Sequence, residues 1–146
     1  MELIVFCGIQ ASGKSSFYKE TFFNTHVRIS LDLLRTRNRE RNFIQTCLST
    51  GQPFVIDNTN PIRMDREVYI KEAKERRYKI IGYYFQSKIE DAIARNNKRK
   101  GREYIPEVGI KGTFSKLELP SYEEGFDEIY YVQIIDNNFV VSNWEA

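Results

Sequence analysis

The stretch that decides the fold reads Gly8-Ile9-Gln10-Ala11-Ser12-Gly13-Lys14-Ser15. It matches the spacing G-x-x-x-x-G-K-[ST] at every fixed position, and it directly follows the apolar run 3–7, which is predicted to be a buried strand. Glycines at both ends permit a tight turn in which backbone N–H groups and the start of the next helix point at one concavity. Because such a concavity captures phosphate, the sequence predicts a nucleoside triphosphate site.

Two side chains of this stretch have specific expected roles. Lys14 is expected to reach the β- and γ-phosphates, and the Ser15 hydroxyl is expected to take one position on a Mg²⁺ ion. The next residue, Ser16, lies in the first turn of the predicted helix 14–23 and is included with the phosphate loop in the expected nucleotide-binding set.

Beyond this loop, apolar runs alternate with segments of helical spacing. The predicted strands are 27–30, 54–56, 80–85 and 129–134, and the predicted helices after the first lie around 43–48, 61–77 and 88–100. This alternation is typical of a parallel sheet covered by helices on both faces. The turn signal at 136–138 predicts that residues 139–141 return as a C-terminal hairpin strand. We therefore expect one α/β domain, 1–146, of the P-loop kinase class, in which residue 88 begins a helical lid.

Composition sets few limits on partners. The chain has 22 basic and 20 acidic residues and a net charge of +2, so any basic surface must come from the distribution of charge. Two cysteines, Cys7 and Cys47, are too few for a disulfide framework and favour a reducing, cytoplasmic setting. The first apolar run has five residues, so neither a signal peptide nor a membrane span is expected. The oligomeric state is left open.

Carboxylates follow two of the predicted strands, at the sheet edge where α/β proteins place their chemistry. Asp32 is a candidate to take the proton of an attacking oxygen, and Arg35 could pair with it or bind an acceptor phosphate. A helix N-cap is an equally good interpretation of Asp32. Asp57 follows strand 54–56, as a Mg²⁺-supporting carboxylate does in many phosphate-loop proteins, although a cap or turn would also place it there.

The densest basic segment comprises Arg95, Lys98, Arg99, Lys100 and Arg102. A solvated helix face is the common alternative for such a run. Arg95 and Arg99 are spaced i, i+4, so on the predicted helix they share a face, and a lid there would supply charge to a transferring phosphoryl group.

Together these features resemble the kinase domain of the 5′-polynucleotide kinases. The resemblance covers residues 3 to about 132 and rests on the phosphate loop, Asp32 with Arg35, the string IDNTNP at 56–61 and the string ARNNKR at 94–99. It implies ATP-dependent phosphorylation of 5′-hydroxyl ends of DNA or RNA, with ATP and Mg²⁺ as cofactors and nucleic acid as the substrate.

The resemblance also implies roles for individual residues. Asp32 is the implied general base and Arg35 an acceptor or phosphate contact, while Lys14 and Ser15 keep their phosphate and metal roles. Asp57 supports the metal or the geometry of the phosphate loop, and Arg99, or else Arg95, engages the transferring phosphate. The implied substrate-binding set is Asp32, Arg35, Asn58, Thr59 and Asn60.

The sequence departs from this family at one informative position. Leu31 stands where these kinases often have arginine before the aspartate, so the resemblance leaves open how the acceptor's 3′-phosphate is bound. No D-x-D-x-T motif is present, and no 3′-phosphatase activity is expected of this chain.

Two other functions remain open at this stage. A P-loop kinase of a small molecule, such as a nucleoside, sugar acid or antibiotic, would share the fold and the phosphate site. A nucleotide-binding switch module without chemistry is the second, although the N-K-x-D motif of signalling GTPases is missing. A series of arginines near the acceptor side favours nucleic acid: Arg35, Arg37, Arg39 and Arg41.

Overall fold

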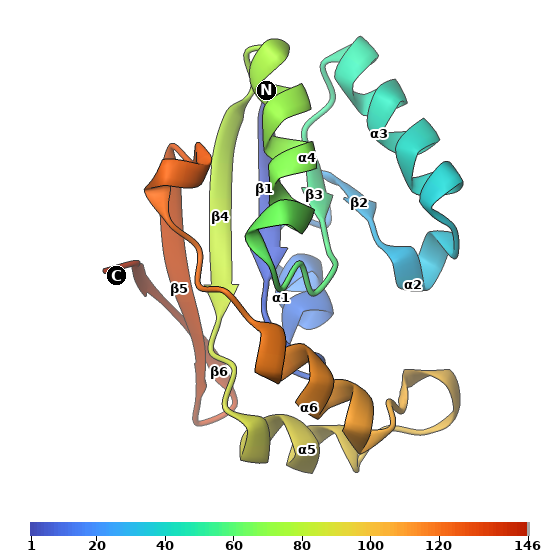
Figure 1. The fold of residues 1–146 in the computed structure, drawn as a ribbon, viewed down its shortest axis with the longest axis vertical. Helices are drawn as coiled ribbons and strands as arrows, with labels where there is room; N and C mark the ends of the chain where they lie inside the picture. The colour runs from blue at the N-terminus through green and yellow to red at the C-terminus, as the bar shows by residue number, and fades with distance from the viewer. Residues whose placement is uncertain (146) are drawn as a thin grey trace.

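The computed structural model describes residues 1–145, which are arranged around one six-stranded sheet (Figure 1). The order across the sheet is β2 (Val27–Ile29), β3 (Phe54–Ile56), β1 (Glu2–Cys7), β4 (Lys79–Phe85), β5 (Glu128–Ile135) and β6 (Asn138–Asn143). The first five strands pair in parallel and β6 pairs antiparallel with β5. Both the parallel sheet and the C-terminal hairpin are therefore confirmed, and the return strand is longer than predicted.

Six α-helices and two short 3₁₀ turns connect the strands. They are α1 (Lys14–Thr21), α2 (Leu31–Leu34), α3 (Arg37–Thr50), α4 (Arg63–Glu75), α5 (Ile89–Asn96), η1 (Gly101–Glu103), α6 (Glu107–Lys116) and η2 (Tyr122–Glu124). Within residues 1–145, no helix has the length and apolar character needed to cross a bilayer.

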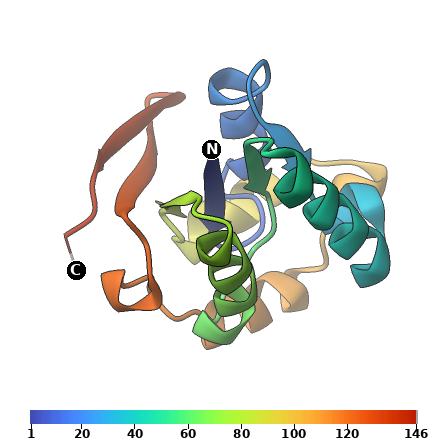
Figure 2. The ribbon, with the colours of Figure 1, turned by 90° about the horizontal axis from the view of Figure 1, so that it is seen from above.

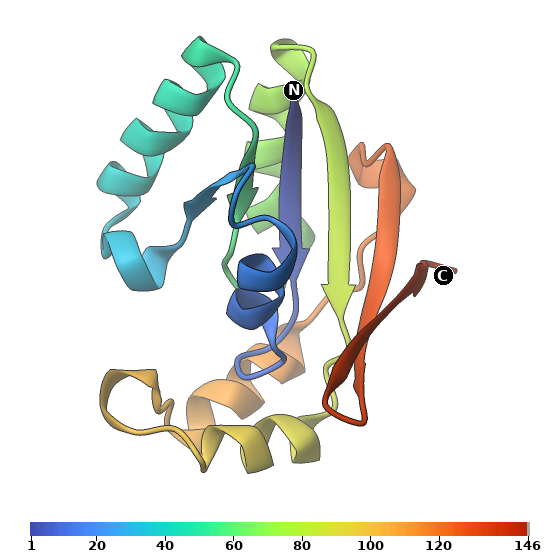
Figure 3. The same cartoon turned by 180° about the vertical axis from the view of Figure 1, so that it is seen from behind.

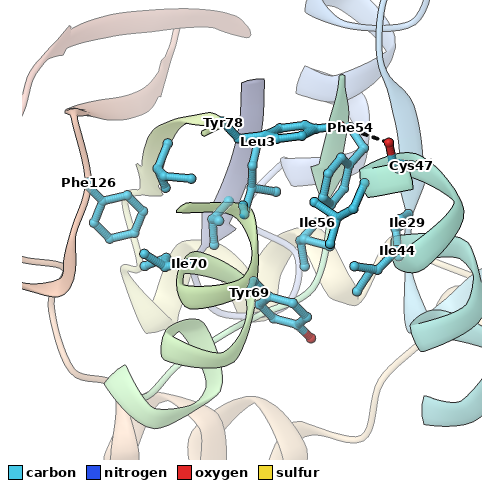
Figure 4. Close-up of a cluster of buried hydrophobic side chains, with 14 of the residues drawn as sticks. Leu3, Ile29, Ile44, Cys47, Phe54, Ile56, Tyr69, Ile70, Tyr78 and Phe126 are labelled. Carbon is cyan, nitrogen blue, oxygen red and sulfur yellow. Dashed lines mark hydrogen bonds between the residues drawn. The ribbon is translucent and has the colours of Figure 1, made fainter. Parts of the chain in front are cut away.

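Helices cover both faces of the sheet, as predicted (Figures 2 and 3). On one face, Leu3 and Ile56 from the strands pack with Ile44 of α3 and with Tyr69 and Ile70 of α4 (Figure 4). The α1 helix packs on the other face, in a cluster rich in aromatic rings: Phe6, Phe17, Phe22 and Phe85. The central strand β1 is buried on both faces because it lies between these two layers.

Two helix boundaries differ from the sequence prediction by more than two residues. The α3 helix begins at Arg37, several residues earlier than its apolar residues indicate, because the Thr36 hydroxyl accepts a hydrogen bond from the Arg39 N–H and caps it. The α5 helix ends at Asn96 and not at Lys100, and its last side chain bonds both backbone groups of Ile105. The prediction that Arg95 and Arg99 share a helix face is therefore wrong.

The α4 helix resolves an ambiguity in the apolar pattern. The sequence allowed either Val68 or Tyr69 to face inward, and the structure buries Tyr69 while Val68 is 52% exposed. Ala73, one turn further along α4, is fully buried as expected.

Candidate nucleotide and acceptor site

The phosphate loop joins β1 to α1 and is held from two sides. Its first residue, Gly8, donates its N–H to the Thr59 carbonyl at 3.0 Å. At the other end Gly13 caps α1 with a left-handed φ of 96°. A Cβ at Gly13 would lie 3.0 Å from both Ile134 Cδ1 and Phe139 Cε1, so the β5–β6 hairpin packs directly against this turn. Glycine is required here for its backbone conformation and for lack of space.

Lys14 lies inside this loop. Its ammonium donates to the carbonyls of Gly8 at 3.0 Å and Ile9 at 2.7 Å, and the residue is 8% exposed. Burial lowers the pKa of Lys14 to about 8, and the charge of Asp57 partly opposes this shift. The charge of Asp32 raises the same pKa and that of Arg99 lowers it, so both groups act electrostatically on the ammonium.

The two predicted metal ligands are adjacent. The Ser15 hydroxyl donates to Asp57 Oδ2 at 2.9 Å, and the Asp57 side chain is 2% exposed. Hydroxyl and carboxylate oxygens suit Mg²⁺, which in nucleotide sites takes one or two carboxylates together with phosphate oxygens and water. Ser15 and Asp57 therefore fit the ion that the sequence predicts.

Arg28 joins this pair and was not singled out from the sequence. Its Nε donates to Asp57 Oδ2 at 2.8 Å and its Nη2 donates to Ser15 Oγ at 3.1 Å. A lone charge between the apolar Val27 and Ile29 of β2 is the signal that could have identified it. Because the guanidinium already neutralises Asp57, a bound Mg²⁺ would share or replace that role.

Replacing Arg28 by methionine should make stability more dependent on metal. Without Mg²⁺ the variant leaves Asp57 buried beside an uncharged chain and should lose roughly 1–3 kcal/mol, less than a fully buried pair because Arg28 is 27% exposed. Relative to EDTA, adding Mg²⁺ and a non-hydrolysable ATP analogue should raise the melting temperature of the variant more than that of the wild type. The reason is that the cation then neutralises Asp57 in place of the guanidinium. Thermal melting in EDTA and in Mg²⁺ measures both effects, with the exposed Arg76→Met as control. Equal Mg²⁺-induced shifts in R28M and wild type would contradict this prediction.

Asp32 lies in the first turn of α2 and is exposed. The N-cap is Ser30, so the interpretation of Asp32 as the N-cap is wrong. Arg35 ends the helix with a left-handed φ of 76° and is also exposed. Within the described chain neither side chain has a hydrogen-bond partner, which leaves both available to a substrate.

Residues 57–60 connect the phosphate loop to its surroundings. The Asn58 amide accepts from the Leu31 N–H and donates to Glu40, each at 2.9 Å. The Asn60 side chain donates to the Phe6 carbonyl at 2.7 Å. Both amides are thus bonded within the protein, and their contact with substrate stays a prediction, as does that of Thr59.

The segment predicted to form a lid, which comprises α5 and the loop that leads to α6, packs on the phosphate loop. Arg95 Nη1 donates to the Ala11 carbonyl at 3.1 Å, whereas Arg99 Nη1 donates to Glu103 within its own loop at 3.3 Å. Ile9 and Ala11 also share an apolar cluster with α5 and α6. In Figures 1 and 2 the segment between α5 and α6, which carries the basic run, lies on the same side of the molecule as α2.

A comparison with protein families decides the identification. The model of a family described as an AAA domain matches residues 3–118, which is most of the chain. The chain belongs to this AAA-domain family. The matched residues include the phosphate loop, α2, residues 57–60 and the lid segment, so this AAA domain has a kinase-like P-loop architecture.

Two curated relatives confirm the resemblance to polynucleotide kinases. The AAA domain is 28% identical over 134 residues to "Bifunctional polynucleotide phosphatase/kinase" of Schizosaccharomyces pombe. It is 31% identical over 136 residues to "Putative bifunctional polynucleotide phosphatase/kinase" of Acanthamoeba polyphaga mimivirus. Each match covers 88% of this chain and 32% of the relative, so the chain spans about a third of the length of these curated relatives.

Solved structures share the fold at lower identity. Kti12 of Chaetomium thermophilum in complex with ADP-AlF3 superposes with a TM-score of 0.67 at 17% identity, over 90% of this chain and 88% of that one. A gluconokinase from Sinorhizobium meliloti 1021 gives a TM-score of 0.65 at 17% identity, over 90% and 82%. These likenesses confirm the α/β P-loop fold and leave the acceptor open.

Proposed function

We propose that this AAA domain transfers the γ-phosphate of ATP to 5′-hydroxyl ends of DNA or RNA. The observation that carries the proposal is the link between the phosphate loop and α2. The Gly8 N–H donates to the Thr59 carbonyl, and the Asn58 side chain accepts from the N–H of Leu31, the neighbour of Asp32. The names of the two curated relatives support nucleic acid as the acceptor.

In the proposed reaction, each charged group at the site has one role. The exposed Asp32 carboxylate accepts the proton of the 5′-hydroxyl as the hydroxyl oxygen attacks the γ-phosphorus in line. The bond from that phosphorus to the β–γ bridging oxygen breaks, and ADP leaves. Lys14 neutralises charge that develops on the transferring group, together with Arg95 or Arg99 from the lid. Mg²⁺, held by Ser15 and Asp57 when bound, supplies further neutralisation of the β- and γ-phosphate oxygens.

The charged surface around α2 suits a phosphate backbone. Two of the arginines near the acceptor side are already paired, Arg37 with Glu40 and Arg41 with Glu72. Arg35 remains exposed, and across the site the lid adds the exposed Lys98 and Lys100. These cations could bind phosphates that follow the 5′ end, with an affinity that falls as salt increases.

The test is transfer of labelled γ-phosphate from Mg²⁺-ATP to 5′-hydroxyl DNA and RNA oligonucleotides. Label is expected on 5′-hydroxyl strands and not on matched 5′-phosphorylated strands. A panel of nucleosides and gluconate serves as the alternative acceptors, because a gluconokinase shares this fold. Label on a small molecule alone would replace the proposal with a small-molecule kinase, and ATP binding without any transfer would favour the switch module.

A further inference from the structure

A buried carboxylate outside the reacting groups lies beside α2. Glu40, in the first turn of α3, is 4% exposed. Its Oε1 accepts from Arg37 Nη1 and from the Tyr69 hydroxyl, both at 3.0 Å, and its Oε2 accepts from Asn58 Nδ2 at 2.9 Å. A buried carboxylate is costly unless its oxygens are bonded, so this network is specified by the fold. Burial raises the pKa of Tyr69 to about 12, which keeps its hydroxyl a donor to Glu40.

Asn58 extends this network to the helix that carries Asp32. Its Oδ1 accepts from the Leu31 N–H at 2.9 Å while its Nδ2 donates to Glu40. The chemistry of the neighbours determines the orientation of the amide, because a carboxylate only accepts and a backbone N–H only donates. Leu31 is the first residue of α2 and the immediate neighbour of Asp32.

Few other contacts hold α2: Leu34 at its end packs against the core, and the N–H groups of Leu33 and Leu34 donate to the Ser30 carbonyl. The helix has four residues, none of them buried, and the Ser30 side chain makes no capping hydrogen bond. The N–H groups of the first helical turn need partners from outside the helix. Asn58 therefore gives the N–H of Leu31, the first residue of α2, a partner from a different strand end.

We propose that Asn58 and Glu40 are positioning residues that hold α2, and with it the Asp32 carboxylate, in place for phosphoryl transfer. The inference rests on the proposed function for the role of Asp32. It assigns Asn58 to the acceptor helix instead of to the substrate itself. Misplacement of a reacting group by about 1 Å can cost on the order of 100-fold in rate, so a remote hydrogen bond of this kind matters to kcat.

Two nearly isosteric substitutions break the network. In Asn58→Asp the donor to Glu40 is lost and two carboxylates face each other. In Glu40→Gln the new amide can still accept from Tyr69, but its N–H₂ then faces that of Asn58. If Asn58 turns to avoid this conflict, it presents a donor to the Leu31 N–H. Each single variant should lower kcat roughly 10- to 100-fold and leave the Kd for ATP within about threefold.

The double variant Glu40→Gln/Asn58→Asp restores both hydrogen bonds of position 58. In the bond to position 40 the donor and the acceptor are exchanged. The amide introduced at position 40 would donate to the carboxylate introduced at position 58, whose other oxygen still accepts from the Leu31 N–H. We expect kcat to return to within about threefold of wild type, far above the product of the two single effects.

The experiment measures kcat, KM for a 5′-hydroxyl oligonucleotide, Kd for ATP, and hydrogen exchange of the Leu31 amide in the full chain. Exposed Asn42→Asp on α3 and Glu67→Gln on α4 repeat the same chemical changes as controls. The inference is supported by faster Leu31 exchange and lower kcat in both single variants, with both restored in the double variant. It is overturned by unchanged Leu31 exchange in the single variants, or by additive losses of kcat in the double variant. If the wild type phosphorylates no 5′-hydroxyl end, the proposed function fails, and Leu31 exchange alone still decides whether this network holds α2.

Discussion

Replacing Asp32 by asparagine is expected to lower kcat for 5′-hydroxyl phosphorylation by roughly 10²- to 10⁴-fold, the contribution typical of a general base. Asparagine has nearly the same shape and is tolerated in the first turn of a helix, so α2 should persist. Because Asp32 is exposed and bonds no other described residue, its loss should not disturb the phosphate loop. The Kd for ATP should therefore stay within about threefold of wild type, which is the signature of an interaction made mainly in the transition state.

Asp91→Asn is the matched control for this measurement. Asp91 is also exposed and also lies in the first turn of a helix, α5. Steady-state kinetics with a 5′-hydroxyl oligonucleotide and direct titration with an ATP analogue measure the two quantities separately. Parallel loss of ATP affinity and turnover in D32N, or turnover equal to that of D91N, would falsify the assignment of Asp32 as the base.

The second large effect concerns stability. Arg66 of α4 is fully buried and forms a bidentate pair with Glu124, at 2.7 Å from Nε to Oε1 and 3.0 Å from Nη2 to Oε2. Its remaining Nη1 donates to the Asn60 carbonyl at 2.9 Å, beside the phosphate loop. Glu124→Ala would leave this guanidinium buried without its partner, so we expect a loss of about 3–5 kcal/mol of unfolding free energy. For a chain of this size that corresponds to a fall of about 10 °C in Tm.

The double variant Arg66→Met/Glu124→Leu tests the cause. Removing both charges should recover much of the stability, because a buried pair replaced by apolar side chains is often neutral. Glu107→Ala breaks the exposed pair with Lys111 and should change stability by less than about 0.5 kcal/mol. Urea denaturation measures all three variants. A loss below about 1 kcal/mol in E124A, or a double variant as unstable as E124A, is the result that would contradict this prediction.

The local pattern of residues along the chain was enough to predict the fold class. The phosphate loop, the apolar runs and the turn signals depend on residues close together in the chain, so their spacing alone indicated a parallel sheet with helices on both faces. The predicted pairing of Ser15 with Asp57 also followed, because the carboxyl ends of parallel strands lie at one edge of a sheet.

Boundaries were less predictable where side chains act at a distance. The end of α5 coincides with the bonds from Asn96 to Ile105, and the start of α3 depends on the hydroxyl of Thr36. Apolar periodicity carries no information on such bonds, so the predicted lid helix was too long at its basic end.

By itself the sequence determined the phosphate loop and the positions of the candidate residues Asp32 and Asp57 after predicted strands, because each depends on short-range spacing. Only the tertiary structure revealed Arg28 between the predicted metal ligands, Glu40 bonded to Asn58 beside α2, and the Arg66–Glu124 pair. These charged residues look like ordinary surface residues in the sequence. Their roles arise because folding removes them from water next to partners 18 to 58 positions away, where an unpaired charge would be too costly.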